Sequence, residues 1–296
     1  VLFYDYSPDS KRGKRPDDYT EVSDEDKFYD VSKTKYRMNL KAALATRMRL
    51  NMWEGNYDEA YKDSRTLQST DYPLTWISTA ELIGEETKQD LTFSKEMIFG
   101  LEAHERFDKV INVYFRRLTE NGLNANPQFM SLPEERASEI YERDKGFATA
   151  DWRYIYWWRE KAEKSYVFNK FWEVDKMVNT NNIPLLKSAE VCYTEAECLL
   201  RKGGAGNKVK AIEALNRVRN NRGLSSMALE TTLPLEDVWE ELTKEWRKEF
   251  MGDGQMFFYY KRIGSTSIPY TSGTVDDNVY VLPLPQLEVD FGGRED

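Results

Sequence analysis

The chain has 296 residues, of which 31% are charged and 40% are hydrophobic, and its formal net charge at pH 7 is -9. This composition is ordinary for a globular protein. The excess of acidic residues argues against nucleic acid as a ligand, because phosphate binding needs a basic surface. The one dense basic run, Lys11–Arg15, lies in a polar segment and is interpreted as a solvated loop. The sequence contains no run of apolar residues long enough to predict a membrane span.

Aromatic residues are the unusual part of the composition: they make up 14% of the chain, including 8 Trp and 18 Tyr. Such side chains serve as stacking surfaces for ligands and as anchors in protein interfaces, and large cores use them too. The aromatic content by itself therefore leaves these three uses open.

The residues that ligate metals are few. Cys192 and Cys198 stand six apart in one predicted helix, which separates them by roughly 9 Å, beyond the reach of a disulfide. With His104 as the single histidine we expect no zinc site. The acidic cluster 24–26 lacks the ligand spacing of a calcium loop. We expect neither a metal ion nor a cofactor.

The spacing of apolar residues predicts two helices, from about Lys33 to Trp53 and from about Tyr57 to Gln68. Gly55 turns the chain between them, and the small side chain of Ala60 lets the two helices approach closely. This arrangement is typical of a tetratricopeptide unit. Because one antiparallel pair cannot bury both of its apolar faces, we expect neighbouring helical pairs.

A long insert follows this pair, over residues 71–182. A short strand is predicted around Ser94 to Glu102. The rest is rich in turn signals and contains DWRYIYWWRE (151–160), the most aromatic stretch of the chain. Long irregular segments in compact proteins are more often functional than idle. The insert is therefore where we expect a binding site.

A second helical pair is predicted after the insert. Its first helix opens at Pro184 and runs to about Lys202, and the return helix runs from about Lys208 to Arg222. Ala211 takes the place in this pair that Ala60 has in the first. A final helix opens at Pro234, with a buried stripe of Trp239, Leu242, Trp246 and Phe250.

Four segments, taken together and in this order, resemble the SusD/RagB family. IPLLKSAEVCYTEAECLL (183–200) with ALNRVRNNRGL (214–224) resembles its paired helices, and LTKEWRKEFMGDGQMFFYYKRIG (242–264) resembles its E-R-R-x-E-L-x-x-E-G-x-R-W-F-D segment. YVLPLPQLEVDFG (280–292) resembles its C-terminal motif, and NLKAALATRMRLNMWEGNYDEAYKDS (39–64) resembles its A-G-D-Y-x-x-A helix pair.

The resemblance implies a mainly helical fold, with tetratricopeptide-like pairs supporting a loop-rich part and a few short strands. It implies an outer-membrane lipoprotein that faces the medium, binds oligosaccharide without cleaving it and covers a SusC-like TonB-dependent transporter. The chain is then a single SusD-like domain over 1–296 that lacks its N-terminal part. It divides into a first helical pair at 33–70, the insert at 71–182, and the second pair with the last helix and tail at 183–296. The sequence opens at Val1 without Met or a signal-like segment, so we expect the lipid anchor to lie outside it.

The chain departs from the family pattern at three positions. The family's Arg and Asp in R-W-F-D fall on Met256 and Tyr259, and its helix Arg falls on Lys187. Because an orphaned buried charge is costly, the loss of both partners is easier to accept than the loss of one. We expect apolar packing to keep the shape of this corner, with the four aromatics 257–260 packed against the helical repeats.

Two other functions remain open beside glycan binding. A glycoside hydrolase needs two carboxylates at working distance, and Glu245 and Glu249 are four residues apart. Basic neighbours make a solvated, ion-paired face the simpler interpretation. Glu190 and Glu197 are interpreted as structural. A tetratricopeptide-type scaffold for protein partners explains the helical pairs but not the aromatic insert.

Ring faces with polar neighbours are what sugar binding requires. We expect ligand contacts, and no catalysis, from six aromatic residues of the insert: Trp76, Trp152, Tyr154, Tyr156, Trp157 and Trp158. If the stretch is extended, Trp152, Tyr154, Tyr156 and Trp158 share one side. Packing of these rings onto the helices is the alternative.

Overall fold

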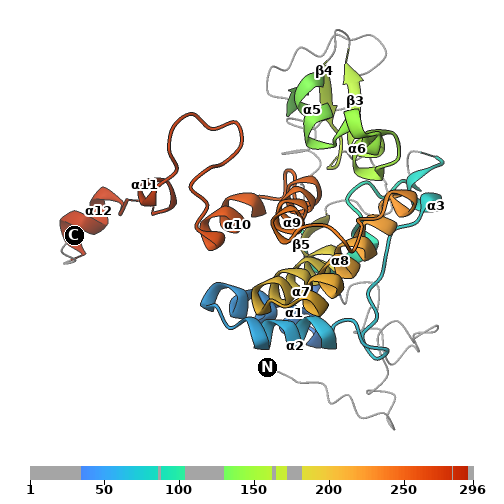
Figure 1. The fold of residues 1–296 in the computed structure, drawn as a ribbon. Coiled ribbons are helices and arrows are strands. Elements are labelled where there is room, and N and C mark those ends of the chain that lie inside the picture. Colours follow the sequence, from blue (N-terminus) through green and yellow to red (C-terminus); the bar gives the residue numbers. More distant parts are fainter. Residues whose placement is uncertain are drawn as a thin grey trace, which may run out of the picture. The chain divides into compact units, whose positions relative to one another are not determined.

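A computed structural model describes residues 35–85, 88–103, 130–161, 165–171, 182–281 and 283–292. The predicted basic loop at 11–15, the acidic cluster at 24–26 and His104 lie outside these ranges. The chain forms two compact units, residues 1–249 and 250–296, which are described separately. Helices dominate the described residues, as expected, and the strands are few and short (Figure 1).

The first helical pair consists of α1 (Leu40–Glu54) and α2 (Tyr57–Thr66). The side chain of Asn39 caps α1 by accepting a hydrogen bond from the backbone N–H of Ala42 at 2.9 Å. Gly55 ends α1 at a φ of 77°, a left-handed conformation that glycine adopts without strain. Ala60 is fully buried. The predicted turn and close approach are confirmed.

The second pair consists of α7 (Ser188–Lys202) and α8 (Ala205–Asn220), followed by α9 (Leu235–Glu249). The helix α7 packs against α8, α2 and α9, so the two pairs lie side by side although the insert separates them in sequence (Figure 1). This contact explains why nearly all of α7 is buried. Ala211 is fully buried in α8, as predicted.

The prediction that Pro184 opens a helix is wrong. Residues Asn182–Lys187 form strand β5, which pairs antiparallel with β1 (Met97–Glu102), and Pro184 lies opposite Gly100. Strand pairing with the distant β1 gives the backbone of this apolar segment its hydrogen bonds, so the helix starts only at Ser188. The strand predicted around Ser94 to Glu102 is confirmed, preceded by a short turn, η6 (Ser94–Glu96).

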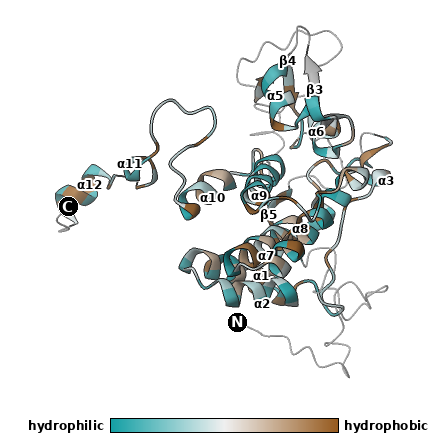
Figure 2. Cartoon of the chain, in the orientation of Figure 1, coloured by the Kyte–Doolittle hydropathy of each residue, from teal (hydrophilic) through white to brown (hydrophobic). Residues whose placement is uncertain are grey.

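The core beneath the helical pairs is continuous with this small sheet. It contains apolar residues from α1, α2, β1, β5 and α7: Ala45, Met48, Met52, Ala60, Leu67, Ile98, Leu186, Val191 and Cys198. In Figure 2, hydrophobic and hydrophilic residues alternate along α1, α2 and α7, as expected of helices with one face on a core. The core therefore fixes the first pair, the sheet and α7 as one body.

The insert has its own elements. The helix α3 (Thr79–Leu82) lies in the segment after α2. A three-stranded antiparallel sheet has the order β2 (Ser131–Pro133), β4 (Ser165–Phe168), β3 (Trp158–Lys161). Around it lie α5 (Glu134–Ile140), the turns η8 (Arg143–Lys145) and η9 (Phe147–Thr149), and α6 (Trp152–Trp157). After α8, the turn η10 (Ser225–Met227) leads to α9.

The last helix of the first unit buries more than the predicted stripe. Leu242 and Trp246 are buried as expected, and Trp239 is half-buried. Val238 joins them, and so do three charged residues, Glu245, Lys248 and Glu249.

The second unit contains α10 (Gln255–Ile263), α11 (Asp277–Tyr280) and α12 (Gln286–Phe291). Of the four aromatics at 257–260, the two tyrosines are buried, but Phe257 is 37% and Phe258 50% exposed. The prediction that all four rings pack away is wrong for these two, because successive residues of a helix point about 100° apart. The strand-like tail forms helical turns, with Pro285 at the start of α12.

No helix in the described ranges is long and apolar enough to cross a membrane.

The burial of Leu215 in α8 gives a direct test of the helical core. Leu215 is fully buried, so Leu215→Ala is expected to lower the free energy of unfolding by about 2–5 kcal/mol, through lost apolar contact and the cavity left behind. Glu213→Ala on the exposed side of the same helix is the control, with a change within about 0.5 kcal/mol. Urea unfolding followed by circular dichroism measures both. Equal effects of the two substitutions would contradict this placement of α8.

Candidate functional site

The aromatic run of the insert forms one short helix and the strand that follows it. Asp151 begins α6 by accepting a hydrogen bond from the backbone N–H of Arg153 at 2.9 Å, and Trp158 starts β3. The stretch is therefore helical from Trp152 to Trp157 instead of extended. Trp152 and Tyr156 share one face of α6, while Arg153 and Trp157 share another.

Two of the six predicted aromatics lie inside the protein. Trp157 is fully buried, and its indole N–H donates to the carbonyl of Leu91 at 2.8 Å. Trp158 is 4% exposed, and its ring lies 4.8 Å from that of Phe168. In this conformation neither ring offers a face to a ligand. Both hold the junction of α6 and β3 against the core.

Two others each contact Arg222, just after the carboxyl end of α8. The backbone N–H of Trp152 donates to the carbonyl of Arg222 at 3.0 Å, and the Arg222 guanidinium carbon lies 5.7 Å from the ring centre of Trp76. Gly223 makes room for the indole: a Cβ there would lie 2.5 Å from Nε1 of Trp152. Trp76 and Trp152 are both half-buried. Two aromatics that lie 76 positions apart in the sequence thus contact the same residue, Trp152 at its backbone carbonyl and Trp76 at its guanidinium.

The tyrosines of α6 complete the partly exposed set. The ring of Tyr154 lies 5.4 Å from that of Tyr141 and 5.8 Å from that of Tyr166. Tyr156 is half-buried, and the neighbouring Ile155 is 43% exposed. Four of the six predicted residues therefore keep part of their surface open, and they form the candidate ligand-binding surface: Trp76, Trp152, Tyr154 and Tyr156.

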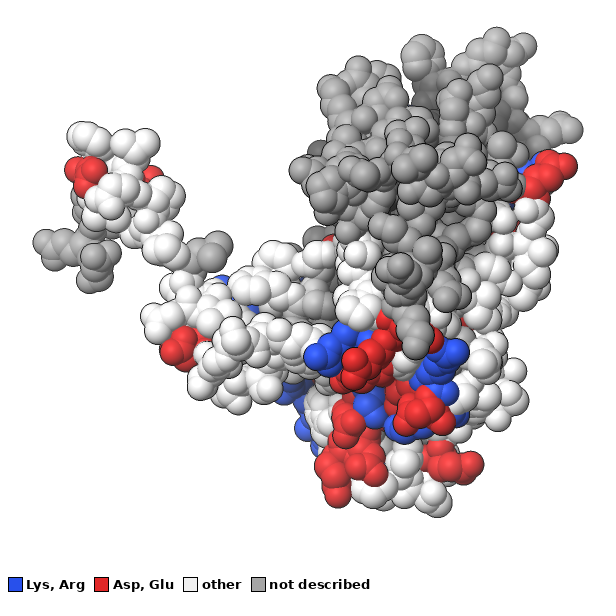
Figure 3. All heavy atoms as spheres, turned by 90° about the horizontal axis from the view of Figure 1, so that it is seen from above, with Lys and Arg blue, Asp and Glu red and all other residues white. Residues whose placement is uncertain are grey.

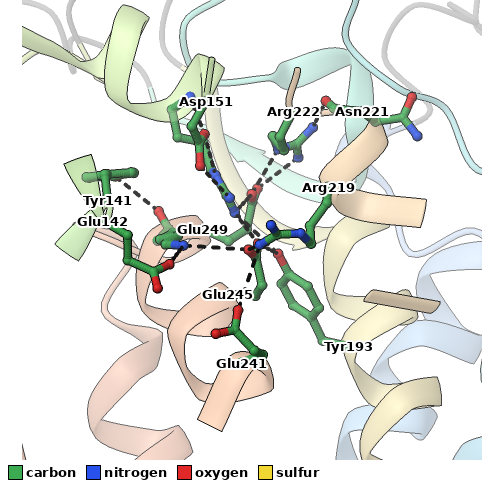
Figure 4. Close-up of polar contacts among 12 residues, drawn as sticks. Tyr141, Glu142, Asp151, Tyr193, Arg219, Asn221, Arg222, Glu241, Glu245 and Glu249 are labelled. Atoms are coloured by element: carbon green, nitrogen blue, oxygen red, sulfur yellow. Dashed lines mark hydrogen bonds and ion pairs between the residues drawn. The ribbon is translucent and has the colours of Figure 1, made fainter. Parts of the chain in front are cut away.

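A buried network of charges lies beneath this surface. Glu245 and Glu249 of α9 are fully buried, which makes the predicted solvated face wrong. Arg219 of α8 contacts Glu245 at 2.9 Å, and Arg222 contacts Glu249 at 3.0 Å. Figure 4 shows these side chains pointing toward one another from the two helices. The face drawn in Figure 3, by contrast, carries acidic and basic side chains intermixed at the surface.

The network also corrects the prediction of an apolar corner. Lys187, the position of the family's helix Arg, is buried and lies 3.3 Å from Glu249. Glu96, the last residue of η6 and just before β1, contacts Arg222 at 2.5 Å. Ion pairs therefore link Glu96, Lys187 and Arg222 to α9, in addition to the apolar side chains buried between the helices.

Charge is balanced among the buried residues that these pairs link. Within the described ranges they are five cations and five carboxylates, each at most 6% exposed: Arg153, Lys187, Arg219, Arg222, Lys248, Glu96, Glu142, Asp151, Glu245 and Glu249. An unpaired buried charge is costly, whereas hydrogen-bonded pairs offset much of the cost of removing each ion from water. The balance explains how so many charges are tolerated inside.

The pKa values follow from this arrangement. Burial alone would raise the pKa of Glu245, but the nearby charges of Arg153, Lys248 and Arg219 outweigh it and hold that pKa well below its ordinary value. Arg222 and Lys187 do the same for the pKa of Glu249. Both groups stay ionised at neutral pH, so neither can act as a general acid, and no substrate reaches them. The pair that suggested a glycosidase is structural.

Sequence reasoning missed most of this network, although a signal for it existed. Glu245 and Glu249 follow Leu242 at steps of three and seven, which places them on the buried face of α9. Arg219 and Arg222 stand three apart at the end of α8. The buried face of one helix thus carries carboxylates at helical spacing, and the end of another carries arginines at similar spacing. Considered together, these charges predict buried ion pairs between the two helices.

The remaining candidates have structural roles. Glu190 accepts hydrogen bonds from Arg49 at 2.7 and 2.6 Å, and Glu197 accepts one from Arg201 at 2.9 Å. Cys192 and Cys198 are buried and are not joined in a disulfide, and burial raises the pKa of the Cys192 thiol to about 12. No cluster of three or more metal-ligating side chains occurs among the residues that the structure describes.

Solved structures share this fold. A SusD superfamily protein from Bacteroides vulgatus ATCC 8482 matches with a TM-score of 0.60 at 20% identity, over 88% of this chain and 59% of that one. One from Bacteroides thetaiotaomicron VPI-5482 gives 0.57 at 19% identity, over 78% of this chain and 51% of that one. Surface glycan-binding protein A from B. thetaiotaomicron, in complex with laminarihexaose, gives 0.55 at 17% identity, over 90% and 64%. The chain thus has the fold of SusD superfamily proteins.

The sequence comparison agrees with the fold. Residues 146–280 match the model of the SusD family, the family that the sequence motifs resemble. The matched region begins just before α6 and ends with α11, so it contains much of the candidate surface and of the buried network. No curated protein matches the sequence. The chain spans about half the length of the SusD superfamily structures from B. thetaiotaomicron and B. fragilis that it matches, 51% and 56%.

The buried charge at Glu245 is expected to matter for stability. Glu245→Gln leaves Arg153 and Arg219 without their shared carboxylate and is expected to lower the free energy of unfolding by about 3–5 kcal/mol. Glu240→Gln is the control, because the Glu240 side chain is 64% exposed and its pair with the half-buried Lys244 is expected to contribute about 0–1 kcal/mol. Chemical unfolding at pH 7 compares the two. A loss below about 1 kcal/mol for Glu245→Gln would show that this carboxylate is not buried among cations.

Glu142 gives a pH-dependent prediction. Burial would raise its pKa, but Lys248, at 2.6 Å, together with Lys145 and Lys244, lowers it from 4.5 to about 2. The pKa is lower in the folded state, so the ionised group stabilises the protein above about pH 4.5. This contribution is lost as the pH falls toward 2.

The stability difference between wild type and Glu142→Gln is therefore expected to be large at pH 7 and to narrow between pH 4.5 and 2. Glu139→Gln removes an exposed carboxylate paired with Arg136 and is expected to show little difference throughout. Thermal unfolding at intervals of half a pH unit measures both. A wild-type advantage over Glu142→Gln that stays constant across this window would refute the assignment.

Proposed function

We propose that this protein is a non-catalytic glycan-binding protein of the cell surface. It captures oligosaccharide by aromatic stacking and hydrogen bonding, and delivers it to a SusC-like TonB-dependent transporter in the outer membrane. In this proposal a lipid anchor outside the present sequence attaches it to the membrane.

One observation carries the binding proposal most strongly. Trp76 and Trp152, which come from separate parts of the insert, both contact Arg222, and both residues are half-buried. Aromatic rings with one packed edge and one open face are suited to the apolar faces of sugar rings. The laminarihexaose complex of a protein with the same fold supports an oligosaccharide as the ligand class.

The absence of cleavage is part of the proposal, and the buried network supports it. The only carboxylate pair that the sequence suggested for hydrolysis, Glu245 and Glu249, is sealed in the core and bound to cations. The mechanism is then equilibrium capture, in which the rings keep their positions and the sugar is released unchanged.

A scaffold function for protein partners is the second candidate. The helix α1 exposes apolar side chains, with Leu50 at 56% and Trp53 at 40%. A tetratricopeptide-like pair with such a face is suited to contact another protein. This surface is also compatible with a transporter partner.

The binding site is tested by titration calorimetry with laminarihexaose as the first probe, followed by a panel of other oligosaccharides. Trp152→Ala and Trp76→Ala are each expected to weaken binding about tenfold, which corresponds to about 1.4 kcal/mol of lost stacking. Trp53→Ala on α1 is the matched control and is expected to leave the affinity unchanged. Unfolding curves for each variant confirm that it remains folded.

Three outcomes would overturn parts of the proposal. Binding that survives both substitutions would place the site elsewhere. Release of reducing ends from a polysaccharide would replace capture by hydrolysis. No heat with any glycan, together with capture of a SusC-like transporter from detergent-solubilised membranes, would favour the scaffold function.

A further inference from the structure

The helix that carries the exposed rings is too short to be stable alone. Helix α6 has six residues, Trp152–Trp157, whereas isolated helices below about 12 residues are marginal in water. Its outward face, with Trp152 and Tyr156, must therefore be held in place by contacts on its inward face. Only Arg153 and Trp157 of this helix are buried.

Arg153 makes the polar contacts of that inward face. Its guanidinium binds Asp151 through two hydrogen bonds, Nε to Oδ1 at 3.0 Å and Nη2 to Oδ2 at 2.8 Å. Nη1 donates to Oε2 of Glu245 at 2.8 Å, and it also lies 3.4 Å from the hydroxyl of Tyr193 and 3.5 Å from Glu249. One side chain thus joins the first turn of α6 to both α7 and α9.

Asp151 couples this anchor to the helix itself. The same Oδ1 that accepts from Nε of Arg153 also accepts from its backbone N–H at 2.9 Å and so caps α6. The cap, the guanidinium and Glu245 therefore form one chain of hydrogen bonds, and a shift of the guanidinium moves the helix start. In the sequence, Trp152 lies between Asp151, which caps α6, and Arg153, so it is flanked by two residues of this hydrogen-bonded network.

We propose that Arg153 is a positioning residue for the ligand-binding surface: its planar guanidinium, held between Asp151 and Glu245, sets the orientation of Trp152. The proposal rests on the proposed function for its link to glycan affinity. Lysine cannot replace arginine here, because an ammonium group cannot bind two carboxylates with the geometry of a planar fork. Positive charge alone is then insufficient.

The chain supplies a matched control in Arg219. Arg219 is also fully buried and donates to the same Glu245, through Oε1 at 2.9 Å. It belongs to α8, however, and its other hydrogen bond goes to the carbonyl of Met227. Arg153→Lys and Arg219→Lys therefore disturb the same carboxylate and keep the same charge, but only Arg153 belongs to α6. Arg219 instead lies over the ring of Phe147 in η9, at 4.9 Å.

The position of Trp152 is measured by ¹⁹F NMR of protein labelled with 5-fluorotryptophan, with its signal assigned by its loss in Trp152→Phe. Arg153→Lys is expected to shift or broaden the Trp152 signal and to weaken laminarihexaose binding at least tenfold. Arg219→Lys is expected to leave the Trp152 signal in place and the affinity within twofold, although both variants lose thermal stability. Asp151→Asn keeps a capping side chain but removes the negative charge that faces the guanidinium of Arg153. It is expected to shift the Trp152 signal in the same direction as Arg153→Lys, but by less.

The outcomes separate this inference from general destabilisation. Equal changes of the Trp152 signal in Arg153→Lys and Arg219→Lys would overturn it, as would an unchanged signal in Arg153→Lys. If Arg153→Lys does not fold, an unchanged signal in Asp151→Asn overturns it, and a shifted signal supports it. A wild-type protein that fails to bind laminarihexaose counts against the proposed ligand, while the NMR comparison still decides the role of Arg153.

Discussion

The guanidinium of Arg222 lies between two buried carboxylates, Glu96 and Glu249, and these contacts join three parts of the first unit. Glu96 ends the turn η6 just before strand β1, Arg222 follows α8, and Glu249 is the last residue of α9. Burial raises the pKa of Glu96, whereas Arg222 and Lys187 lower that of Glu249. The neighbouring Arg219 and Arg153 extend the same kind of pairing to Glu245. The remaining features of the site depend on this charged junction.

A buried ionic junction differs from an apolar one in what it specifies. Replacing buried ion pairs with hydrophobic residues of similar volume is often neutral or stabilising, so such pairs are weak evidence for stability. Their hydrogen bonds, however, are satisfied only in one relative placement of the elements. In this protein the placement matters, because the insert elements that carry the rings are short. The junction therefore contributes the orientation of the elements that carry the rings, rather than overall stability, to the candidate site.

The same junction connects the helical body to the insert elements that carry the candidate surface. The helical pairs and α9 form the body, and Trp76, Arg222 and Trp152 meet at its edge. Hydrogen bonds of Arg153 and Trp157 fix the inward face of α6, and Gly223 leaves room for the indole of Trp152. The proposed capture of glycan needs only this arrangement, with no movement of charged groups at the surface.

Much of the fold could be predicted from local pattern. The helical pairs, the turn at Gly55, the close approach at Ala60 and Ala211 and the strand at Met97–Glu102 depend on residues near one another in sequence. The errors occurred where a distant partner decided the local structure. Pro184 lies in a strand because β1 pairs with it, and the run after Asp151 is a helix because its inward face has a buried carboxylate to bind.

The candidate site shows the same division. Composition and turn signals located the aromatic insert, and they named residues of which four, Trp76, Trp152, Tyr154 and Tyr156, remain partly exposed. They could not distinguish these from Trp157 and Trp158, because burial depends on what packs against a ring. The sequence by itself determined the helical body and the segment that holds the rings, and its motifs indicated the SusD family that residues 146–280 match. Only the tertiary structure decided which rings face outward and that Glu245 and Glu249 face inward, since pairing with Arg153, Arg219 and Arg222 is a contact between elements that no local pattern contains.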